Sequence, residues 1–489
     1  MEDIDETTGE LGDDTPGARF ERGKRRLGLV LGPIVAVGVG LLDRGGASPT
    51  LVGLIVLCVI WWLTEAVPPA AVALIAAVGA VVGGVATPKV AFGAFGTPLL
   101  FLFVGSFFIA EAMRVHGLGE RLCSAVARRA RGRLSFLVAI GLTAFFLSMV
   151  MSNSAATAII LPIALSMAST SRDRYGAALV LVVAWGASVG GLGTPVGTPP
   201  NGFGIQELAQ RGVSFGFLDW MAIGVPMGLV MMVALFGVLA LVFKIRPGQP
   251  LPERAIAPPR AWSVGESAVV IAFAVAILGW LAPTVVGLVA PRSEITAWFE
   301  THVTEEVVAL VAGCLLFVLP GNDRGKPRRP ALTWSEATKI EWGVILLFGG
   351  GILLGTLSKD TGLAEQWGHA LVDLTGASTT WTITALVTAT AIVLSEATSN
   401  TATASMMAPL AGALAMAANA NPFPAVLGAT MGASFGFMMP ISTGPNALAY
   451  ATGRVTVGQM ARTGIIFDVV GFFLILGTLR VLCPLLGWT

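Results

Sequence analysis

The sequence contains few charged residues. Only 12% of its 489 residues are Asp, Glu, Lys or Arg, whereas 55% are hydrophobic. A soluble globular domain carries about twice that share of charged residues. Eight acids and five bases also lie within the first 26 residues, which leaves the rest of the chain poorer still. Because apolar runs long enough to span a bilayer recur from residue 27 onward, we expect a polytopic protein embedded in the lipid bilayer.

Cysteine and histidine are also scarce, and their spacing excludes several kinds of site. The four cysteines are widely separated, without a CxxC pair, and none of the three histidines lies near another. This argues against a disulfide framework and against a Cys/His metal centre. The chain also lacks HExxH, a paired membrane Asp, and a Ser with a Lys or His base, so we expect neither an enzyme nor an organic cofactor. A net charge of +1 without a large basic surface excludes nucleic-acid binding.

Eleven membrane spans are expected, apart from two uncharged hairpins. They lie near residues 27–42, 50–66, 69–86, 98–113, 177–195, 221–243, 264–289, 304–320, 342–357, 422–440 and 464–485. With the N-terminus in the cytoplasm, 24 Lys and Arg residues fall on inner segments and six on outer ones. Such an excess over short loops is a strong orientation signal. We therefore expect a multi-pass protein of the inner (plasma) membrane with a cytoplasmic N-terminus.

Three segments of the first half recur in the second half, in the same order and at nearly the same offset. The pairs are 103–120 with 348–365, 152–165 with 399–412, and 187–201 with 433–446. The expected topology places an odd number of spans between matching points, so the second copy is inverted relative to the first. Inverted repeats are typical of secondary transporters, because two related halves generate inward- and outward-facing states.

Each half contains a long stretch almost free of charge with a polar tripeptide inside it. Residues 134–171 contain no acidic or basic side chain, and Ser152-Asn153-Ser154 lies at their midpoint. Residues 374–453 contain only Glu396, and Ser399-Asn400-Thr401 lies at the corresponding place. Both stretches must return to the side from which they came, which predicts two helical hairpins. A polar tip at membrane depth is tolerated only where it lines a cavity or is buried in protein.

Glycine and proline interrupt a further span in each half, at residues 193–201 and 442–446. Proline removes a backbone donor and glycine admits unusual backbone angles, so carbonyl oxygens and half-helix ends are freed near mid-membrane. Carbonyl, hydroxyl and amide oxygens suit Na⁺, whereas N–H groups at half-helix N-termini favour a carboxylate. Tip and break together therefore predict one cation site per repeat, with an anion site between the two.

Simpler interpretations stay open for individual residues. A lone polar side chain in a membrane helix more often serves helix packing through an interhelical hydrogen bond. Glu396 is either a structural acid, hydrogen-bonded inside the hairpin or near its tip, or a proton carrier or ligand. The arginine-rich stretch 114–133 predicts an amphipathic helix on the cytoplasmic surface.

The paired SNS and SNT tips, the TEA and SEA segments, and the GTPPN and STGPN breaks resemble the divalent anion/sodium symporter family, the INDY-type di- and tricarboxylate carriers. The resemblance implies an all-α homodimer in which a scaffold holds a transport domain that moves as an elevator, with eleven transmembrane helices and two re-entrant hairpins. The implied parts are a disordered cytoplasmic tail (1–26), the scaffold helices (27–133 and 264–373), the halves of the transport domain (134–243 and 374–489) and a cytoplasmic linker (244–263).

The resemblance also implies the binding residues. It places the first Na⁺ site at Ser148, Ser152, Asn153 and Gly197, and the second at Ser395, Thr398, Asn400 and Ser442. It places the substrate carboxylates at Ser152, Asn153, Ser154, Thr198, Ser399, Asn400, Thr401, Thr443 and Gly444. The family commonly has proline where this chain has Gly444, so we expect the glycine to widen or loosen the site beside the substrate.

The expected site contains no Lys, Arg or His, and a divalent anion there would be desolvated without a fixed counter-charge. Bound cations must then supply the compensation. We therefore expect Na⁺-coupled symport of C4-dicarboxylates such as succinate, malate or fumarate. The same scaffold carrying citrate, sulfate or another divalent anion, or working as an anion exchanger, is the nearest alternative. A channel is disfavoured because two hairpin tips would close the pathway.

Overall fold

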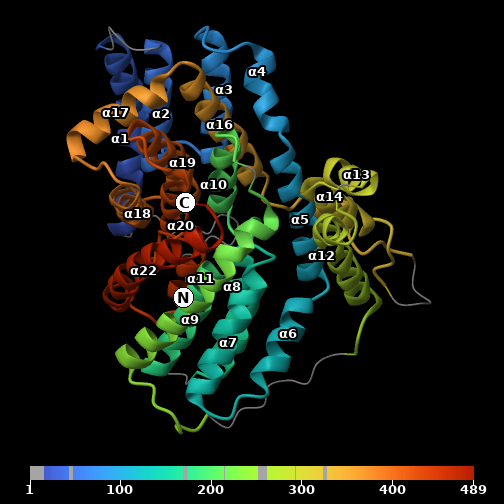
Figure 1. Cartoon of the computed structure of the whole chain (residues 1–489). Helices are drawn as coiled ribbons and strands as arrows, with labels where there is room; N and C mark the ends of the chain where they lie inside the picture. Colours follow the sequence, from blue (N-terminus) through green and yellow to red (C-terminus); the bar gives the residue numbers. More distant parts are fainter. Residues whose placement is uncertain are drawn as a thin grey trace.

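The computed structural model describes residues 16–42, 48–168, 173–213, 215–251, 261–291, 293–322 and 328–488. These residues form helices and no β-strand (Figure 1). Seven of the helices are long and apolar enough to cross a membrane, and several other apolar helices are shorter. The chain is therefore an all-helical, multi-pass membrane protein, as its composition predicts. The number of eleven spans stays a prediction.

The first half of the chain forms the helices expected from its apolar runs. The helices that contain expected spans are α1 (Pro16–Leu42), α2 (Pro49–Thr64), α3 (Pro69–Val82), α5 (Pro98–Val115), α9 (Arg174–Gly191) and α11 (Phe217–Phe243). Shorter elements are α4 (Pro88–Gly93), a 3₁₀ turn (Ala94–Gly96), α6 (Leu118–Ala127) and α10 (Pro199–Gln210). Because α1 begins at Pro16, the last part of the tail expected to be disordered is helical, and residues 1–15 lie outside the described residues. The amphipathic α6 lies within the expected surface helix.

The second half adds helices that the sequence did not indicate. Expected spans correspond to α12 (Val264–Val289), α14 (Glu305–Leu315), α16 (Trp342–Asp360), α20 (Pro422–Ala433) and α22 (Val457–Leu485). Unexpected helices are α13 (Glu294–His302), α15 (Trp334–Ala337) and α17 (Leu363–Thr375), and α21 (Gly444–Ala451) follows the second break. The expected span 422–440 is wrong at its end, because α20 stops at Ala433, well before the Gly/Pro motif.

Two helical hairpins form where the uncharged stretches predict them. The first pairs α7 (Arg133–Ser148) with α8 (Asn153–Ser166), and the second pairs α18 (Thr380–Ala397) with α19 (Asn400–Ala417). In each hairpin the serine of the polar tripeptide caps the second arm: Ser152 Oγ accepts from Ala155 N, and Ser399 Oγ from Ala402 N. Serine is a favoured N-cap because its side chain satisfies an unpaired N–H of the first turn. Re-entry into the membrane stays a prediction for both hairpins.

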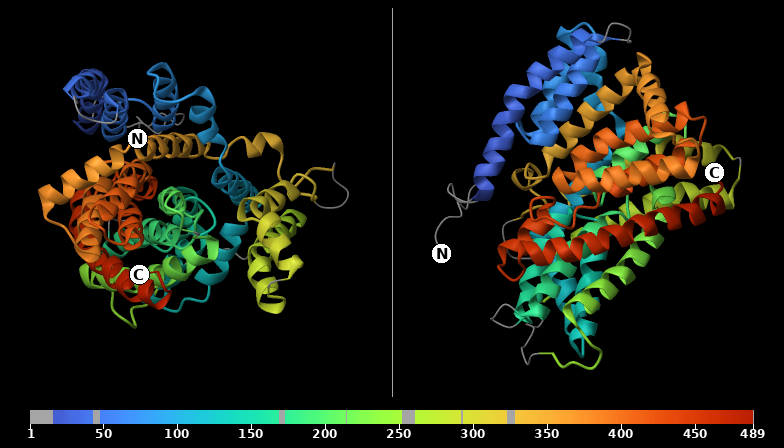
Figure 2. Two further views of the ribbon diagram at one scale, coloured as in Figure 1. Left: turned by 45° about the horizontal axis from the view of Figure 1, so that its top comes forward. Right: turned by 90° about the vertical axis from the view of Figure 1, so that its left-hand side faces the viewer.

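Helix α9 is the centre of the molecule and α12 lies at its edge. In α9, 94% of the apolar stretch is buried, against 17% in α12, so most of the apolar surface of α12 is not covered by the rest of the chain. Trp185 of α9 stacks on Phe467 and contacts Phe437 edge-on, which joins α9 to the C-terminal helices. Figure 2 shows α12, α13 and α14 in yellow on one flank, away from this core.

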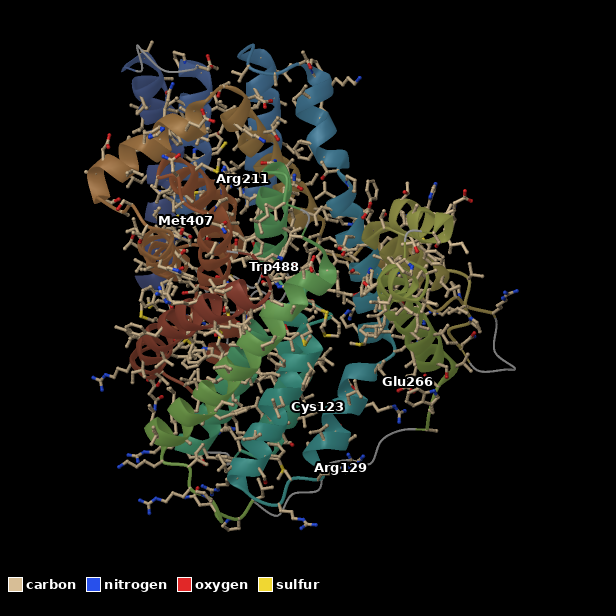
Figure 3. All side chains as sticks on the ribbon, in the orientation of Figure 1. Cys123, Arg129, Arg211, Glu266, Met407 and Trp488 are labelled. Atoms are coloured by element: carbon tan, nitrogen blue, oxygen red, sulfur yellow. The ribbon has the colours of Figure 1, made fainter. Side chains whose placement is uncertain are left out.

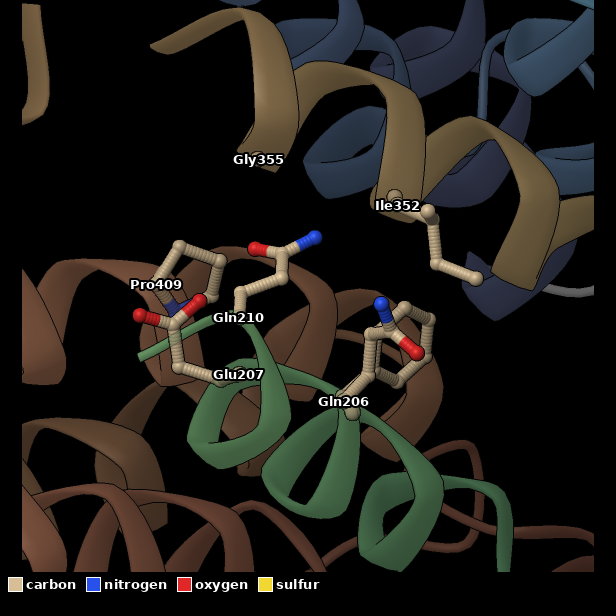
Figure 4. Close-up of a pocket in the computed structure, with 8 residues that line it drawn as sticks. Gln206, Glu207, Gln210, Ile352, Gly355 and Pro409 are labelled. Atoms are coloured by element: carbon tan, nitrogen blue, oxygen red, sulfur yellow. The ribbon is translucent and has the colours of Figure 1, made fainter. Parts of the chain in front are cut away.

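The helices pack in two groups. One contains α7 to α11 with α18 to α22, and the other contains α1 to α5 with α12, α14 and α16. A main contact between them joins α10 to α16, where Phe203 stacks on Phe348. A small pocket lies beside it, where Gln210 of α10 points toward Gly355 of α16 and Glu207 lies beside Pro409 (Figure 4).

Arginines assigned to opposite sides of the membrane lie in different parts of the molecule. Arg129, counted as cytoplasmic, lies at the lower end in Figure 3, whereas Arg211, counted as external, lies in the upper half. This separation agrees with the expected topology, and the cytoplasmic location of the N-terminus stays a prediction.

Candidate functional site

Four helix N-termini carry the candidate site. Two belong to the hairpin arms α8 and α19, and two to the half-helices α10 and α21 that follow the breaks. All four N-cap residues have extended backbones: Ser152, Thr198, Ser399 and Thr443. Each hairpin arm packs on the half-helix from the other half of the chain: α8 packs on α21, and α19 packs on α10. Unpaired N–H groups at such termini carry partial positive charge, so the arrangement favours an anion.

The first hairpin tip and the second break are in direct contact. A Cβ atom added to Gly444 would overlap with the Oγ atom of Ser154. The Ser154 hydroxyl fills the space that a larger residue at position 444 would occupy, and the expectation that Gly444 widens or loosens the site beside the substrate stays a prediction. The glycine makes the site compact, by allowing a segment of one half to approach the tip of the other.

The expected ligands of the first cation lie around the Asn153 amide. The amide oxygen is 2.6 Å from Ser148 Oγ, and the same atom position is 3.2 Å from Ala187 O and 3.3 Å from Gly197 O. The amide orientation that satisfies these neighbours is the rotated one, in which the NH₂ group donates to Ser148 Oγ and to the two carbonyls. Asn153 is half-buried and Ser148 fully buried. The Ser152 hydroxyl already accepts a hydrogen bond as the N-cap of α8. The sequence did not indicate Ala187, because this residue contributes a backbone carbonyl, which every residue type has.

The second tip has a related arrangement. Ser395 Oγ donates to Asn400 Oδ1 at 2.7 Å and lies 2.6 Å from Ala433 O, and Asn400 Nδ2 donates to Ser434 O at 3.2 Å. The carbonyls of residues 433 and 434 are available because α20 ends at Ala433, so that the backbone turns toward the tip. These two carbonyls are further oxygens that the sequence did not indicate.

Two expected cation ligands use their hydroxyls elsewhere. The Thr398 hydroxyl contacts Leu394 O and Thr403 Oγ1, within the hairpin. The Ser442 hydroxyl lies 2.9 Å from both the backbone oxygen and Oε2 of Glu396. The assignment of Thr398 and Ser442 to the second cation site stays a prediction.

Two asparagines hold the broken segments in shape. Asn201 Nδ2 donates to Gly191 O at 2.8 Å and Thr194 O at 2.7 Å, and Asn446 Nδ2 donates to Gly436 O at 2.7 Å and Met439 O at 2.9 Å. These bonds satisfy carbonyls that the breaks leave without helical partners. The recurrence of Asn at the end of both Gly/Pro motifs was the available signal, but it was not assigned a role.

Glu396 is buried and hydrogen-bonded, and its role as a structural acid, a proton carrier or a ligand stays a prediction. Its partners, however, lie in the second break and not inside the hairpin. Oε1 accepts from Phe437 N at 2.6 Å and Met438 N at 2.8 Å, and Oε2 accepts from Ser442. One carboxylate therefore fixes the irregular segment between α20 and α21.

Within the part of the chain that the structure describes, no basic side chain forms a hydrogen bond or an ion pair with the residues of the two tips. The tip residues are half-buried, namely Ser152, Asn153, Ser154, Ser399, Asn400 and Thr401. Thr198 is buried and Thr443 half-buried, with the Thr443 hydroxyl accepting from Asn446 N. The site thus offers oxygen atoms and N–H groups without a fixed cation, which suits an anion bound together with cations.

The sequence matches a family model described as citrate transporter, over residues 59–429 and 296–487. The chain belongs to the citrate/dicarboxylate transporter family. A relative from Staphylococcus saprophyticus, named a sodium-dependent dicarboxylate transporter, is 31% identical over 94% of this chain and 91% of its own length. Its counterpart in Staphylococcus aureus is 30% identical over the same shares. The resemblance drawn from the SNS, SNT and Gly/Pro motifs is confirmed, and the family consists of transporters rather than enzymes.

Two solved transporters share the fold. The crystal structure of YdaH from Alcanivorax borkumensis superposes with a TM-score of 0.55 at 15% identity, over 81% of this chain and 87% of that one. MtrF from Neisseria gonorrhoeae superposes with a TM-score of 0.53 at 13% identity, over 83% of each chain. At this level of identity the likeness concerns the fold alone.

Proposed function

We propose that this family member is a Na⁺-coupled symporter of C4-dicarboxylates such as succinate, malate or fumarate. The observation that carries the proposal is the contact between Ser154, at the N-terminus of α8, and Gly444, at the N-terminus of α21, which joins the two halves of the chain. A carboxylate at each pair of N-termini would accept hydrogen bonds from backbone N–H groups and from hydroxyls. Two carboxylates separated by a short carbon chain match a site built from two related halves.

Sodium is the cation that the surroundings of Asn153 and Asn400 support. Each amide lies among hydroxyl and carbonyl oxygens, without an acidic or basic side chain as a direct partner. Such neutral oxygens are hard ligands that suit an alkali ion. Two monovalent cations would neutralise a divalent anion, which otherwise enters a low-dielectric site at high cost. The relatives named as sodium-dependent dicarboxylate transporters agree with this assignment.

The grouping of the helices supports an elevator movement of an inverted repeat. The tips, breaks and C-terminal helices pack with one another, while α1 to α5 with α12, α14 and α16 form the second group. The first group would move as the transport domain and the second would remain as the scaffold, which we expect to dimerise. The matching bonds of Asn201 and Asn446 support two related halves.

Citrate is the second candidate, because the matching family model is described as a citrate transporter. The filled space between Gly444 and Ser154 favours the smaller acid, since a third carboxylate would need room beside this contact. Sulfate transport and anion exchange are further outcomes that a direct measurement separates.

Uptake of labelled succinate into proteoliposomes tests the proposal. We expect uptake with an inward Na⁺ gradient, little with K⁺ in its place, and competition by malate and fumarate more than by citrate or sulfate. Asn322→Ala, on a loop outside both helix groups, is a matched asparagine control that should transport normally. Na⁺-independent uptake that requires an internal anion would instead establish an exchanger, and competition by citrate alone would reassign the substrate.

A further inference from the structure

A large apolar groove lies between the first hairpin and the edge helix α12. Its volume is about 970 Å³, and its walls come mainly from α6, α7, α11 and α12. Every described residue that lines it is apolar, except Thr143 and Thr194. The hydroxyls of these threonines donate to Ala139 O at 2.8 Å and to Met149 O at 2.5 Å. The groove therefore offers no obvious partner to a polar ligand.

The lining residues form one face of each wall helix. They recur every three or four positions, as in Val270, Ala274, Ile277 and Leu281 of α12 and Leu122 and Val126 of α6. Such spacing places side chains on one side of a helix. Leu122 is 46% exposed and Ile277 is 42% exposed, so the rest of the described chain does not cover these faces.

The groove has about the length of one lipid leaflet. Its lining on α12 runs from Val270 to Leu281, about 16 Å at a rise of about 1.5 Å per residue. The hydrocarbon core of a bilayer is about 30 Å thick, so one leaflet has about this depth. At one end the walls meet, because the Phe217 ring of α11 stacks on the Trp280 ring of α12 with centroids 4.1 Å apart. The dimensions therefore suit an extended acyl chain.

Arginines follow the opposite end of the groove, in the turn that joins α6 to α7. Arg128, Arg129 and Arg131 are exposed, and residues 121–134 contain no acid. Arg129 comes three positions after the lining residue Val126, and its N–H donates to Val126 O at 3.1 Å. It lies at the lower end of the molecule in Figure 3. Positive charge next to an apolar groove favours the headgroup of an anionic lipid.

The acid at the start of α12 does not oppose such a headgroup, because it is already paired. Glu266 accepts from Arg121 Nε at 2.5 Å and from Arg121 Nη2 at 3.0 Å. The same guanidinium lies over the exposed ring of Trp262, 5.0 Å from its centroid. Tryptophan is enriched at the membrane–water interface. This cluster therefore places headgroup level at the start of α12, near the end of the groove that the arginines follow.

We propose that the groove binds an anionic phospholipid. One acyl chain lies between α7, α11 and α12, and the phosphate group lies at the arginines that follow α6. Hydrocarbon is the occupant that an apolar groove within a bilayer favours, and the arginines select the charge of the headgroup. Since α7 and α11 belong to one helix group and α12 to the other, the lipid separates the two groups. This binding does not depend on which solute the protein transports.

Native mass spectrometry of the purified protein tests the headgroup part. The protein is titrated with phosphatidylglycerol or with phosphatidylcholine of the same acyl chains, and wild type should bind the former more tightly. Replacement of Arg128, Arg129 and Arg131 by glutamine should remove this preference, at about fivefold in affinity for each arginine. Arg462→Gln, at an exposed arginine of α22, is a matched control that should keep it. Equal affinities of wild type for both lipids, or an unchanged preference in the triple variant, would refute the headgroup site.

Filling the groove tests the position of the acyl chain. Ala274→Trp places a large ring among the lining residues and should abolish tight binding of phosphatidylglycerol. Leu278→Trp, at an exposed residue of α12 outside the groove lining, is a matched control that should bind it normally. Val270→Trp fills the same groove if Ala274→Trp does not fold. Unchanged lipid binding by a folded groove-filling variant would overturn the proposal. Loss of a dimer with lipid binding intact would also overturn it, by assigning the groove to a second copy of the chain.

Discussion

Replacement of Gly444 by alanine tests whether the two halves meet at the substrate. The added Cβ would overlap with Ser154 Oγ, so the serine must rotate or α21 must move. Adding a methyl group to a packed site costs about 1–3 kcal/mol. A hydroxyl turned away from a carboxylate loses about 1.5–3 kcal/mol more, the usual range for a hydrogen bond to a charged group. At 1.4 kcal/mol per factor of ten, the loss of the hydroxyl contact alone weakens succinate binding about 10- to 150-fold.

The Ser154→Ala variant separates the two contributions. It removes the hydroxyl, so the added Cβ at position 444 would meet Ser154 Cβ at 3.3 Å instead, a tight but tolerable contact. Gly444→Ala should therefore cost much less in a Ser154→Ala background than in wild type. Groups in contact are expected to be non-additive in this way.

The assay measures uptake of succinate, and competition for it, in proteoliposomes. It compares wild type, Gly444→Ala, Ser154→Ala and the double variant. Gly237→Ala on α11 is a matched control, because a Cβ at that glycine meets nothing within 4 Å. Additive effects of the two substitutions, or normal uptake by Gly444→Ala, would show that Ser154 and Gly444 do not act together on the substrate.

Two further predictions concern the cation sites and the moving interface. Asn153→Ala and Asn400→Ala should each abolish Na⁺-dependent uptake while the protein remains folded, as judged by its elution and melting in detergent; wild-type uptake in either would rule out the assigned site. Lys359→Met should shift the molecule away from the observed state, because Lys359 Nζ donates to Gln210 O at 2.5 Å between α16 and α10. The distribution of spin-label distances between these helices should then broaden. An unchanged distribution would show that this contact does not stabilise the observed state.

The sequence was sufficient for the helices and for the residues at the tips. Apolar runs placed most spans, and the charge-free stretches placed both hairpins, because lipid leaves few alternatives to a helix. It was insufficient where backbone atoms and not side chains form the site, as at Ala187 and Ala433, whose carbonyls face the tips. It also could not show that Ser154 fills the space beside Gly444, since this space depends on what another segment places there.

The Asn153 amide suggests how Na⁺ and substrate binding are joined. Without a cation, the amide orientation that satisfies its neighbours directs the NH₂ group at Ala187 O, Gly197 O and Ser148 Oγ. Na⁺ binding would then turn the NH₂ group away from the carbonyls, toward the half-buried face of the tip, where a carboxylate can accept from it. Because one side chain serves both ligands, neither should bind tightly alone, so Asn153→Ala should lose succinate binding together with Na⁺ binding.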